Sequence, residues 1–168
     1  METHVSAKVI PWSYSSLQSF ETCPRRHYLT RIAKVVKEPQ GPALLEGNAT
    51  HKALERAVRG IEPLPHKYKR YIPIVQRVLA TPGQKTAEEN FAVTAGFSPT
   101  GYWDTNAWYR GKKDLEILRS GHALAFDYKT GKVKDDPSQL ALTAAVTFAQ
   151  HPTVEKVTTA YLWLDYNK

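Results

Sequence analysis

The sequence has few of the features that characterise secreted or membrane-spanning proteins. Its 168 residues include one cysteine, Cys23, which excludes an intramolecular disulfide and favours a reducing compartment. No apolar run approaches the roughly 18–20 residues that a bilayer crossing requires. The first ten residues lack the long apolar core of a secretory signal, and internal repeats and low-complexity segments are also absent. We therefore expect a cytoplasmic globular protein.

The composition predicts a folded chain with a positive charge. Hydrophobic residues make up 42% of the chain and aromatic residues 11%, which is enough for a sizeable core. Lysine and arginine number 23 against 16 aspartate and glutamate residues, so the formal net charge is +7. This excess favours a polyanionic partner such as nucleic acid, although many basic proteins bind none.

The hydrophobic pattern predicts helices first and a sheet after them, as in a single α/β or α+β domain. Residues 1–12 are expected to form a loose arm. Helices are predicted from Ser15 to just before Pro24 and over residues 25–36, 43–59, 66–80 and 136–150. Strands are predicted over residues 88–94, 108–118, 122–128 and 156–164.

Cap and turn signals place several of these boundaries. Ser15 and Gln18 have the spacing of a capping box, and Asp136 is the expected cap of the helix that carries Gln139. A hairpin turn is predicted at residues 119–121. The helix over residues 25–36 is expected to turn Tyr28, Leu29 and Ile32 inward.

The most informative polar group stands at the end of the predicted strand 122–128. Because side chains alternate along a strand, Asp127 and Lys129 point to the same face of the sheet. A carboxylate and an ammonium at a sheet rim can hold a divalent metal and stabilise a developing anion. The alternative is a surface ion pair that contributes little to stability.

A second carboxylate is expected near the first. Asp114 and Asp127 stand seven and six residues from Gly121, so a hairpin about this glycine brings them close across the ladder. Two such carboxylates repel each other unless a cation bridges them, and hard divalent ions prefer oxygen ligands. The alternative is that Asp114 is a solvated residue beside Lys112 and Lys113.

Two more polar residues depend on this context. His51 shares a helix face with Glu55, and a lone helical histidine is usually structural unless acids lie nearby. Gln139 follows Asp136 by three residues, and a capping box would explain it equally well. Gly-rich phosphate loops, HExxH helices and Gly-x-Ser-x-Gly turns are absent from the sequence, and Cys23 alone makes no zinc or iron–sulfur site.

Taken in order, these residues resemble the motifs of the PD-(D/E)XK nuclease superfamily, and within it the RecB-type exonuclease branch. The matching segments, in chain order, are an N-terminal helix with a Cys23-Pro24 step, Gly47-Asn-Ala-Thr-His51-Lys-Ala-Leu-Glu55, Glu88, Gly111-Lys-Lys-Asp114, Asp127-Tyr-Lys-Thr-Gly131 and Gln139. They span residues 13–165, and phage-encoded members look similar.

The resemblance implies a restriction-endonuclease-like core, which is a central mixed sheet flanked by helices and preceded by a helical segment. It implies one nuclease domain over residues 1–168. Residues 1–80 would form its helical part with the histidine motif, and residues 86–168 would form the catalytic sheet and helix. The implied activity is metal-dependent hydrolysis of DNA phosphodiester bonds from an end, in recombination, repair or end processing. The alternative is a DNA-binding module with the same fold that is inactive or needs a missing C-terminal region.

The resemblance also implies residue roles and a Mg²⁺ or Mn²⁺ ion. The residues implied in catalysis are Lys129, Asp127, Asp114, Glu88 and Gln139, and those implied in metal binding are His51, Asp114, Asp127 and the Tyr128 carbonyl. Lys129 would position or activate a water and stabilise charge on the phosphate.

Two departures from the family pattern affect these expectations. Many relatives have a tyrosine one turn after the glutamine, where this chain has Thr143. Several also hold an iron–sulfur cluster with one N-terminal and three C-terminal cysteines, whereas no cysteine follows Cys23 here. We therefore expect no cluster in this chain.

Basic side chains among aromatic ones indicate where DNA would bind, because they can contact phosphates and stack on exposed bases. The alternative is that they form solvated helix faces. These residues are Arg25, Arg26, Lys67, Lys69 and Arg70. The sequence leaves open the strand preference, the polarity of cleavage and the oligomeric state.

Overall fold

The computed structural model describes residues 10–133 and 136–166, so most of the arm expected at residues 1–12 lies outside the described residues. The chain forms two compact units, which we describe separately. Unit 1 contains residues 10–37 and 90–111, and unit 2 contains the described residues from Glu38 to Glu89 and from Lys112 onward. This division into two units does not test the expectation of one nuclease domain, which stays a prediction.

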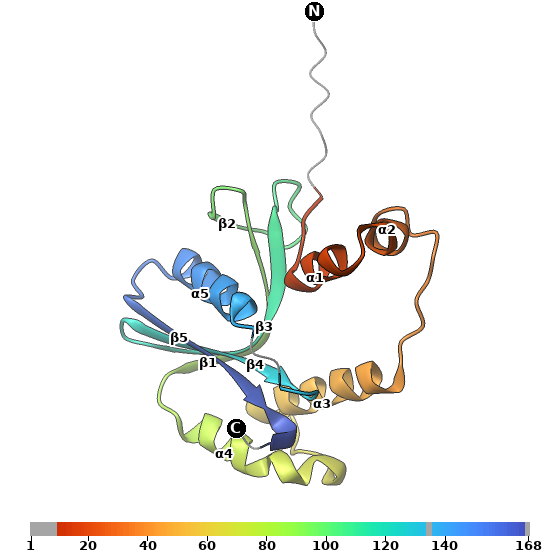
Figure 1. Cartoon of the computed structure of the whole chain (residues 1–168). Helices are drawn as coiled ribbons and strands as arrows, with labels where there is room; N and C mark the ends of the chain where they lie inside the picture. Colours follow the sequence, from red (N-terminus) through yellow and green to blue (C-terminus); the bar gives the residue numbers. More distant parts are fainter. Residues whose placement is uncertain (1–9, 134–135, 167–168) are drawn as a thin grey trace, which may run out of the picture. The chain divides into compact units, whose positions relative to one another are not determined.

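Five strands form one mixed sheet in the order β2-β1-β3-β4-β5, with β4 and β5 parallel and the other described pairs antiparallel (Figure 1). The strands are β1 (Gln84–Val93), β2 (Pro99–Thr100), β3 (Tyr109–Arg119), β4 (His122–Lys129) and β5 (Lys156–Trp163). The helices are α1 (Tyr14–Thr22), α2 (Pro24–His27), α3 (Pro42–Val58), α4 (Ile72–Ala80) and α5 (Ser138–Gln150). Three short segments are the π-helical η1 (Tyr28–Ile32) and the 3-10 helices η2 (His66–Tyr71) and η3 (Leu164–Tyr166). The predicted mixed α+β fold is confirmed.

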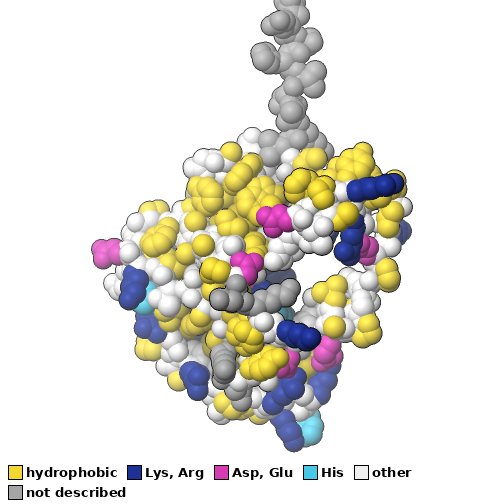
Figure 2. All heavy atoms as spheres, in the orientation of Figure 1, with side chains coloured by type: hydrophobic (Ala, Val, Ile, Leu, Met, Phe, Trp, Pro, Cys, Tyr) yellow, Lys and Arg dark blue, Asp and Glu magenta, His cyan; other side chains and the backbone are white. Residues whose placement is uncertain are grey.

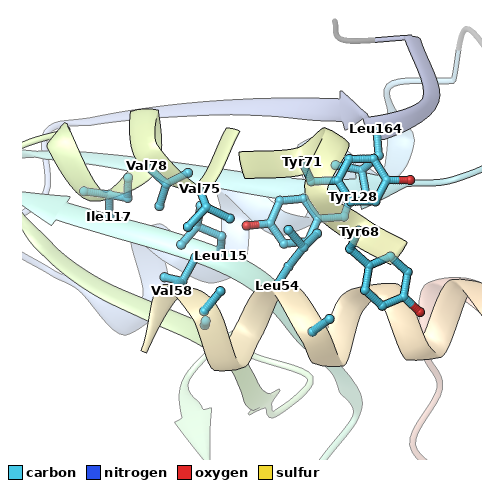
Figure 3. Close-up of a cluster of buried hydrophobic side chains, with 13 residues drawn as sticks. Leu54, Val58, Tyr68, Tyr71, Val75, Val78, Leu115, Ile117, Tyr128 and Leu164 are labelled. Carbon is cyan, nitrogen blue, oxygen red and sulfur yellow. The ribbon is translucent and has the colours of Figure 1, made fainter. Parts of the chain in front are cut away.

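In unit 2, helices cover both faces of the sheet (Figure 1). One face packs against α3, η2 and α4, and Figure 3 shows Leu54 and Val58 of α3 turned toward Leu115 of β3 in this core. Leu54 and Leu115 are completely buried. Burial of such a side chain stabilises a fold by about 1.5–3 kcal/mol, so this layer holds α3 firmly against the sheet.

The other face of the unit 2 sheet carries a buried charged network under α5. Lys113 and Glu116, both on β3, are 3% and 2% exposed and form an ion pair. The Glu116 carboxylate also accepts a hydrogen bond from Thr147 Oγ1 at 3.2 Å and lies 2.8 Å from His151 Nε2. Because buried charges need partners, this network ties α5 to β3 in one arrangement.

Replacing Glu116 by leucine is expected to destabilise the protein by about 3–5 kcal/mol, because it leaves the Lys113 ammonium buried with only Glu89 at 3.9 Å. Urea unfolding followed by circular dichroism measures the change. The double variant Lys113→Met with Glu116→Leu removes both charges and should recover most of the loss.

A surface ion pair provides the matched control for this measurement. Lys67 and Glu46 lie 3.3 Å apart with both side chains more than half exposed. Glu46→Gln should therefore cost less than about 1 kcal/mol. Equal losses in Glu116→Leu and Glu46→Gln would contradict a stabilising role for the buried network.

The predicted hairpin is confirmed in its turn and its register. Strands β3 and β4 pair from Arg119 opposite His122 to Leu115 opposite Phe126. Gly121 has φ +66°, a conformation that a residue with a side chain rarely adopts. The turn therefore sets which residues of the two strands lie opposite each other.

Several local predictions were wrong. Ser13, not Ser15, caps α1, since its Oγ accepts a hydrogen bond from Ser16 N at 3.3 Å. The helix predicted over residues 25–36 ends at Ile32, and Tyr28 and Ile32 are exposed. Helix α5 begins at Ser138, two residues after the expected cap, although Asp136 Oδ1 still accepts from Ser138 N at 3.0 Å. Hydrophobic spacing alone therefore did not identify the exposed face of the short N-terminal helices.

The sheet also differs in detail from the prediction. Strand β1 begins at Gln84, four residues before the predicted start, and the two-residue β2 was not predicted. The 3-10 segment η2 replaces the first part of the helix predicted over residues 66–80. Among the described helices, none is long and apolar enough to cross a membrane.

Unit 1 is rich in aromatic packing. Trp12 forms a parallel bridge with Tyr109, and their rings lie 4.3 Å apart. The Trp12 ring also meets Trp108 edge-on at 5.1 Å. Gly111 passes so close to Phe91 that a Cβ there would stand 2.7 Å from its ring, which explains a glycine at this position.

Candidate metal centre

Three metal-ligating side chains converge in unit 2 from three different elements. They are His51 of α3, Glu88 of β1 and Asp114 of β3, and their ligand atoms lie within 4.8 Å of one another. His51 Nδ1 stands 3.3 Å from Asp114 Oδ1 and 3.5 Å from Glu88 Oε1. Residues 37 and 26 positions apart in the chain thus meet at one point, which only the fold could bring about.

A glycine on α3 allows this helix to approach the end of β4. Gly47 stands one turn before His51, and a Cβ at this position would lie 3.3 Å from Thr130 Oγ1. That distance is shorter than ordinary van der Waals contact, so with a larger residue at position 47 the Thr130 side chain would have to shift by a few tenths of an ångström. Gly47 thus lets α3 and Thr130, just after β4, lie in close contact one turn before His51.

The backbone of β1 turns Glu88 into the cluster. Glu88 has φ +53°, which is uncommon for a residue other than glycine. Regular alternation would put Ala87 and Glu88 on opposite faces. Instead, Ala87 joins the core beneath α3 and Glu88 contacts His51 on the same side. Such strained residues are concentrated at functional sites, where the surrounding structure holds them in place.

Hydrogen bonds with Tyr128 of β4 hold both Asp114 and His51. Asp114 Oδ2 accepts a bond from Tyr128 N at 2.7 Å, and His51 Nε2 lies 3.1 Å from Tyr128 O. Because a carbonyl only accepts, Nε2 must carry the proton in this contact. In the neutral ring, Nδ1 then directs its lone pair toward Glu88 and Asp114.

The negative charges dominate the electrostatics of this cluster. Burial lowers the pKa of His51, but hydrogen bonds and charge from Asp114 and Glu88 outweigh it and raise the pKa to about 10. Burial raises the pKa of Glu88. Hydrogen bonds and charge from His51 and Lys112 lower it by more, so the pKa of Glu88 lies below its ordinary value. The two carboxylates therefore stabilise positive charge at His51 and Lys112, and a metal ion would take the place of the His51 proton.

A second group of polar side chains lies next to the first, around the end of β4. Lys129 Nζ stands 2.7 Å from Asp127 Oδ2, which confirms that these side chains share a face. The Lys129 ammonium also lies 5.1 Å from the centre of the Tyr161 ring on β5. Burial and the Asp114 charge raise the pKa of Asp127 to about 6, although Lys129 and His51 lower it. The two carboxylates are therefore close enough to repel each other.

Gln139, in the first turn of α5, links the two members of this group. Its Oε1 accepts a hydrogen bond from Lys129 Nζ at 2.8 Å, and its Nε2 donates to Asp127 Oδ1. Lysine can only donate and a carboxylate can only accept, so the amide orientation follows from the partners. Gln139 is thus directed to the sheet and does not form the capping box that the sequence also allowed.

The donor set fits a divalent ion of the Mg²⁺ or Mn²⁺ type. Glu88 Oε1 is buried and its contact with His51 Nδ1 is long, at 3.5 Å, so a bound cation would satisfy this oxygen better. Carboxylate oxygens are the ligands of hard divalent ions, and imidazole adds affinity for Mn²⁺. Asp127 is not one of the three clustered residues, and its carboxylate contacts Lys129 and Gln139.

An open hollow of about 490 Å³ gives access to the cluster. Lys112 stands at this hollow and its Nζ lies 2.8 Å from Glu88 Oε2. The hollow is lined by Asn48, His51, Lys52, Glu55, Glu88, Lys112 and Asp114. Acids and cations together suit a ligand that carries negative charge and also contacts a metal.

Comparison with known protein families matches residues 11–164 to the PD-(D/E)XK nuclease superfamily. The chain belongs to this superfamily. No curated protein matches the sequence. Membership implies a nuclease that uses divalent metal, and the cluster of His51, Glu88 and Asp114 could hold that metal. The match covers the N-terminal helices as well as the sheet and α5.

The structure places the predicted DNA-binding residues in both units. Arg25 and Arg26 are exposed on α2 of unit 1, and Lys69 is exposed on η2 of unit 2. Also on η2, Lys67 pairs with Glu46, and Arg70 pairs with Asp165 at 2.9 Å. Their part in DNA binding stays a prediction.

The sequence interpretation did not identify two contacts of the site. From the sequence, Lys112 is only a neighbour that would make Asp114 a solvated residue, and Tyr161 is only a residue of the last strand. Asp127 and Tyr161 lie opposite each other in the parallel pair β4·β5, which no local pattern reveals. The sequence does contain a signal for Lys112. It stands two residues before Asp114, and strand alternation directs the side chains of Lys112 and Asp114 to the same face of the sheet.

The pKa of His51 predicts how metal binding depends on pH. A pKa of about 10 keeps the ring protonated at neutral pH, whereas a metal binds only the neutral ring. Each bound ion should therefore displace a proton, and the apparent affinity should rise about tenfold per unit between about pH 7 and 8.5. Titration calorimetry with Mg²⁺ across this range measures it, and an affinity that does not change with pH would contradict the prediction.

Proposed function

We propose that this protein is a divalent-metal-dependent deoxyribonuclease that hydrolyses phosphodiester bonds from a DNA end, as an exonuclease of the RecB-type branch. One observation carries the proposal: the cluster of His51, Glu88 and Asp114 lies beside a lysine held by Asp127. A negatively charged ligand cluster next to a fixed ammonium can bind a metal and a phosphate at neighbouring points.

The metal would be held by His51, Glu88 and Asp114, with Asp127 and the Tyr128 carbonyl at its margin. When bound, a divalent ion lowers the pKa of water and neutralises charge on a phosphate. The protein fixes the ligand positions through the Tyr128 backbone, whose N–H binds Asp114 and whose carbonyl binds His51. These bonds keep the ligands in place before the substrate arrives.

Lys129 would act on the phosphate and on the attacking water. Its Nζ is directed by Asp127 Oδ2 and by Gln139 Oε1, which leaves one ammonium proton for a third partner. A positive charge at that point stabilises the negative charge that develops on phosphate oxygens. Gln139 acts as a positioning residue, since it touches Lys129 and Asp127.

Basic side chains on one part of unit 2 support a path for DNA away from the metal centre. Lys52 lines both the hollow at the cluster and a second one of about 390 Å³, which Arg56 and Lys67 also line. Phosphates of a strand that passes over α3 would meet these cations. We include Lys67, Lys69 and Arg70 in this path, and Arg25 and Arg26 as separate contacts in unit 1.

The proposal extends to a cellular role in recombination, repair or processing of DNA ends, in the cytoplasm of a bacterium or a phage-infected cell. Support comes from the resemblance to phage-encoded RecB-type enzymes and from the single cysteine, which suits a reducing compartment.

A nuclease assay on end-labelled linear DNA tests the proposal. Single- and double-stranded substrates are incubated with Mg²⁺, Mn²⁺ or EDTA, beside closed circular DNA of the same sequence. We expect products only from linear DNA and only with metal, and the label position gives the polarity. Cleavage of circles would replace the exonuclease by an endonuclease. No cleavage with either metal would favour a DNA-binding module without activity.

A further inference from the structure

We propose that Trp103 and Tyr102, in the loop between β2 and β3 of unit 1, form with Arg110 of β3 a stacking site for an unpaired nucleobase. This inference rests on the proposed function and deepens it, because it names single-stranded DNA as the form of substrate that the protein binds. The site lies in unit 1, whereas all the residues of the candidate metal centre lie in unit 2.

Trp103 is exposed to an unusual degree for a tryptophan. It is 81% exposed, the largest value among the exposed large hydrophobic residues that are described. Other aromatic side chains of the same unit, Phe91 and Tyr109, are almost completely buried. Because tryptophan is usually well buried, an indole left in solvent indicates a binding role more than a structural one.

The exposed indole belongs to an ordered group of side chains. The rings of Tyr102 and Trp103 meet edge to face at 4.9 Å. The Arg110 guanidinium lies 5.1 Å from the centre of each of these rings, and its Nη1 donates to Tyr102 O at 3.4 Å. A cation at this distance from a ring is attracted by its π face.

Backbone bonds fix the loop that presents Trp103. Asp104 N donates to Gly101 O at 3.0 Å, and Asp104 Oδ1 accepts from Asn106 N at 2.7 Å. Ala107 N closes a further turn on Asp104 O at 3.1 Å, and the Ala107 side chain is buried. A fixed platform loses little conformational entropy when a ligand stacks on it.

The composition of unit 1 suits a single strand. Figure 2 shows hydrophobic side chains gathered over β2 and the neighbouring end of β3. The described part of unit 1 holds ten of the chain's 18 aromatic residues, including three of its four tryptophans. Its charged residues are Arg25, Arg26, Arg31, Lys34, Lys37 and Arg110 against Glu21 and Asp104. Aromatic faces within a positive surface are the combination that binds single strands without sequence preference.

The surroundings of Trp103 favour a nucleobase over other ligands. Its exposed neighbours in the sequence, Gly101, Asp104, Thr105 and Asn106, are polar or lack a side chain, so the indole is the large apolar side chain that this stretch of the loop exposes. Inside a duplex the base faces are already stacked on one another, so an unpaired base covers the indole at a lower cost than a paired one. Arg110 beside the ring suits the adjacent phosphate.

Fluorescence anisotropy of the full chain in EDTA tests the site without cleavage. The probes are a labelled oligothymidylate, an oligomer of equal length that lacks bases, and a duplex. Trp103→Ala should weaken oligothymidylate binding about 10- to 100-fold, whereas Trp103→Phe should stay within about threefold of wild type. Binding of the baseless oligomer and the duplex should stay unchanged. Phe148→Ala, which removes a 44% exposed aromatic side chain in unit 2, is the matched control.

Two results would overturn the inference: unchanged oligothymidylate binding by Trp103→Ala, or an equal loss on the baseless oligomer, which would indicate a backbone or folding effect. The nuclease assay separates this inference from the proposed function. If DNA stays uncut in every metal but Trp103→Ala still loses only base-dependent binding, the stacking site stands and the nuclease proposal fails. If wild type cleaves DNA and Trp103→Ala binds normally, the stacking site fails alone.

Discussion

Replacing Lys129 by alanine is expected to lower the single-turnover rate of DNA cleavage about 10²- to 10³-fold while metal binding changes little. The Lys129 ammonium is the group that would contact the phosphate, and Asp127 and Gln139 hold it in position. Among the described residues, no other cation contacts both of these side chains, so none would replace it. The His51, Glu88 and Asp114 cluster does not include Lys129, so the ion keeps its ligands. Quenched-flow cleavage and Mn²⁺ calorimetry measure the two effects.

The matched control for this substitution is Lys156→Ala, which removes an exposed lysine at the start of β5. It should cleave DNA at the wild-type rate. Since Lys129→Ala leaves the largely buried Asp127 without its cation, Lys129→Gln provides a second variant of similar length that can still bond to the carboxylate. Full activity in a folded Lys129→Gln protein would contradict the assigned role.

Replacing Asp114 by asparagine is expected to weaken binding of Mg²⁺ or Mn²⁺ more than about 100-fold and to abolish cleavage. Residues that merely support metal ligands cost about 10–100-fold when they are replaced, and Asp114 is proposed as a ligand itself. Asparagine keeps an oxygen for Tyr128 N, whose bond to Asp114 Oδ2 is 2.7 Å, so the fold should survive. Calorimetry and the nuclease assay measure the two losses.

An exposed carboxylate provides the control for Asp114→Asn. Glu155, which precedes β5, is exposed and outside the cluster, so Glu155→Gln should bind metal and cleave DNA as wild type does. A folded Asp114→Asn protein that binds the ion with wild-type affinity would remove Asp114 from the ligand set. The proposal for the metal centre would then be wrong.

The buried network of Lys113 and Glu116 shows one limit of local pattern. Next to Asp114 the sequence has two lysines, and they looked equivalent. In the structure Lys112 stands half exposed against Glu88, while Lys113 is buried against Glu116 under α5. Alternation along β3 directs the two neighbours to opposite faces, and only packing shows that one face is covered.

Local chemistry alone determined the hairpin about Gly121 and the shared face of Asp127 and Lys129, because turn preference and strand alternation act over a few residues. Tertiary structure decided the rest. It turned Glu88 into the cluster through a strained backbone, linked Gln139 to β4 across the layer between helix and sheet, and left Trp103 in solvent. These features depend on contacts between residues far apart in the chain, whose energies appear only when the layers have packed.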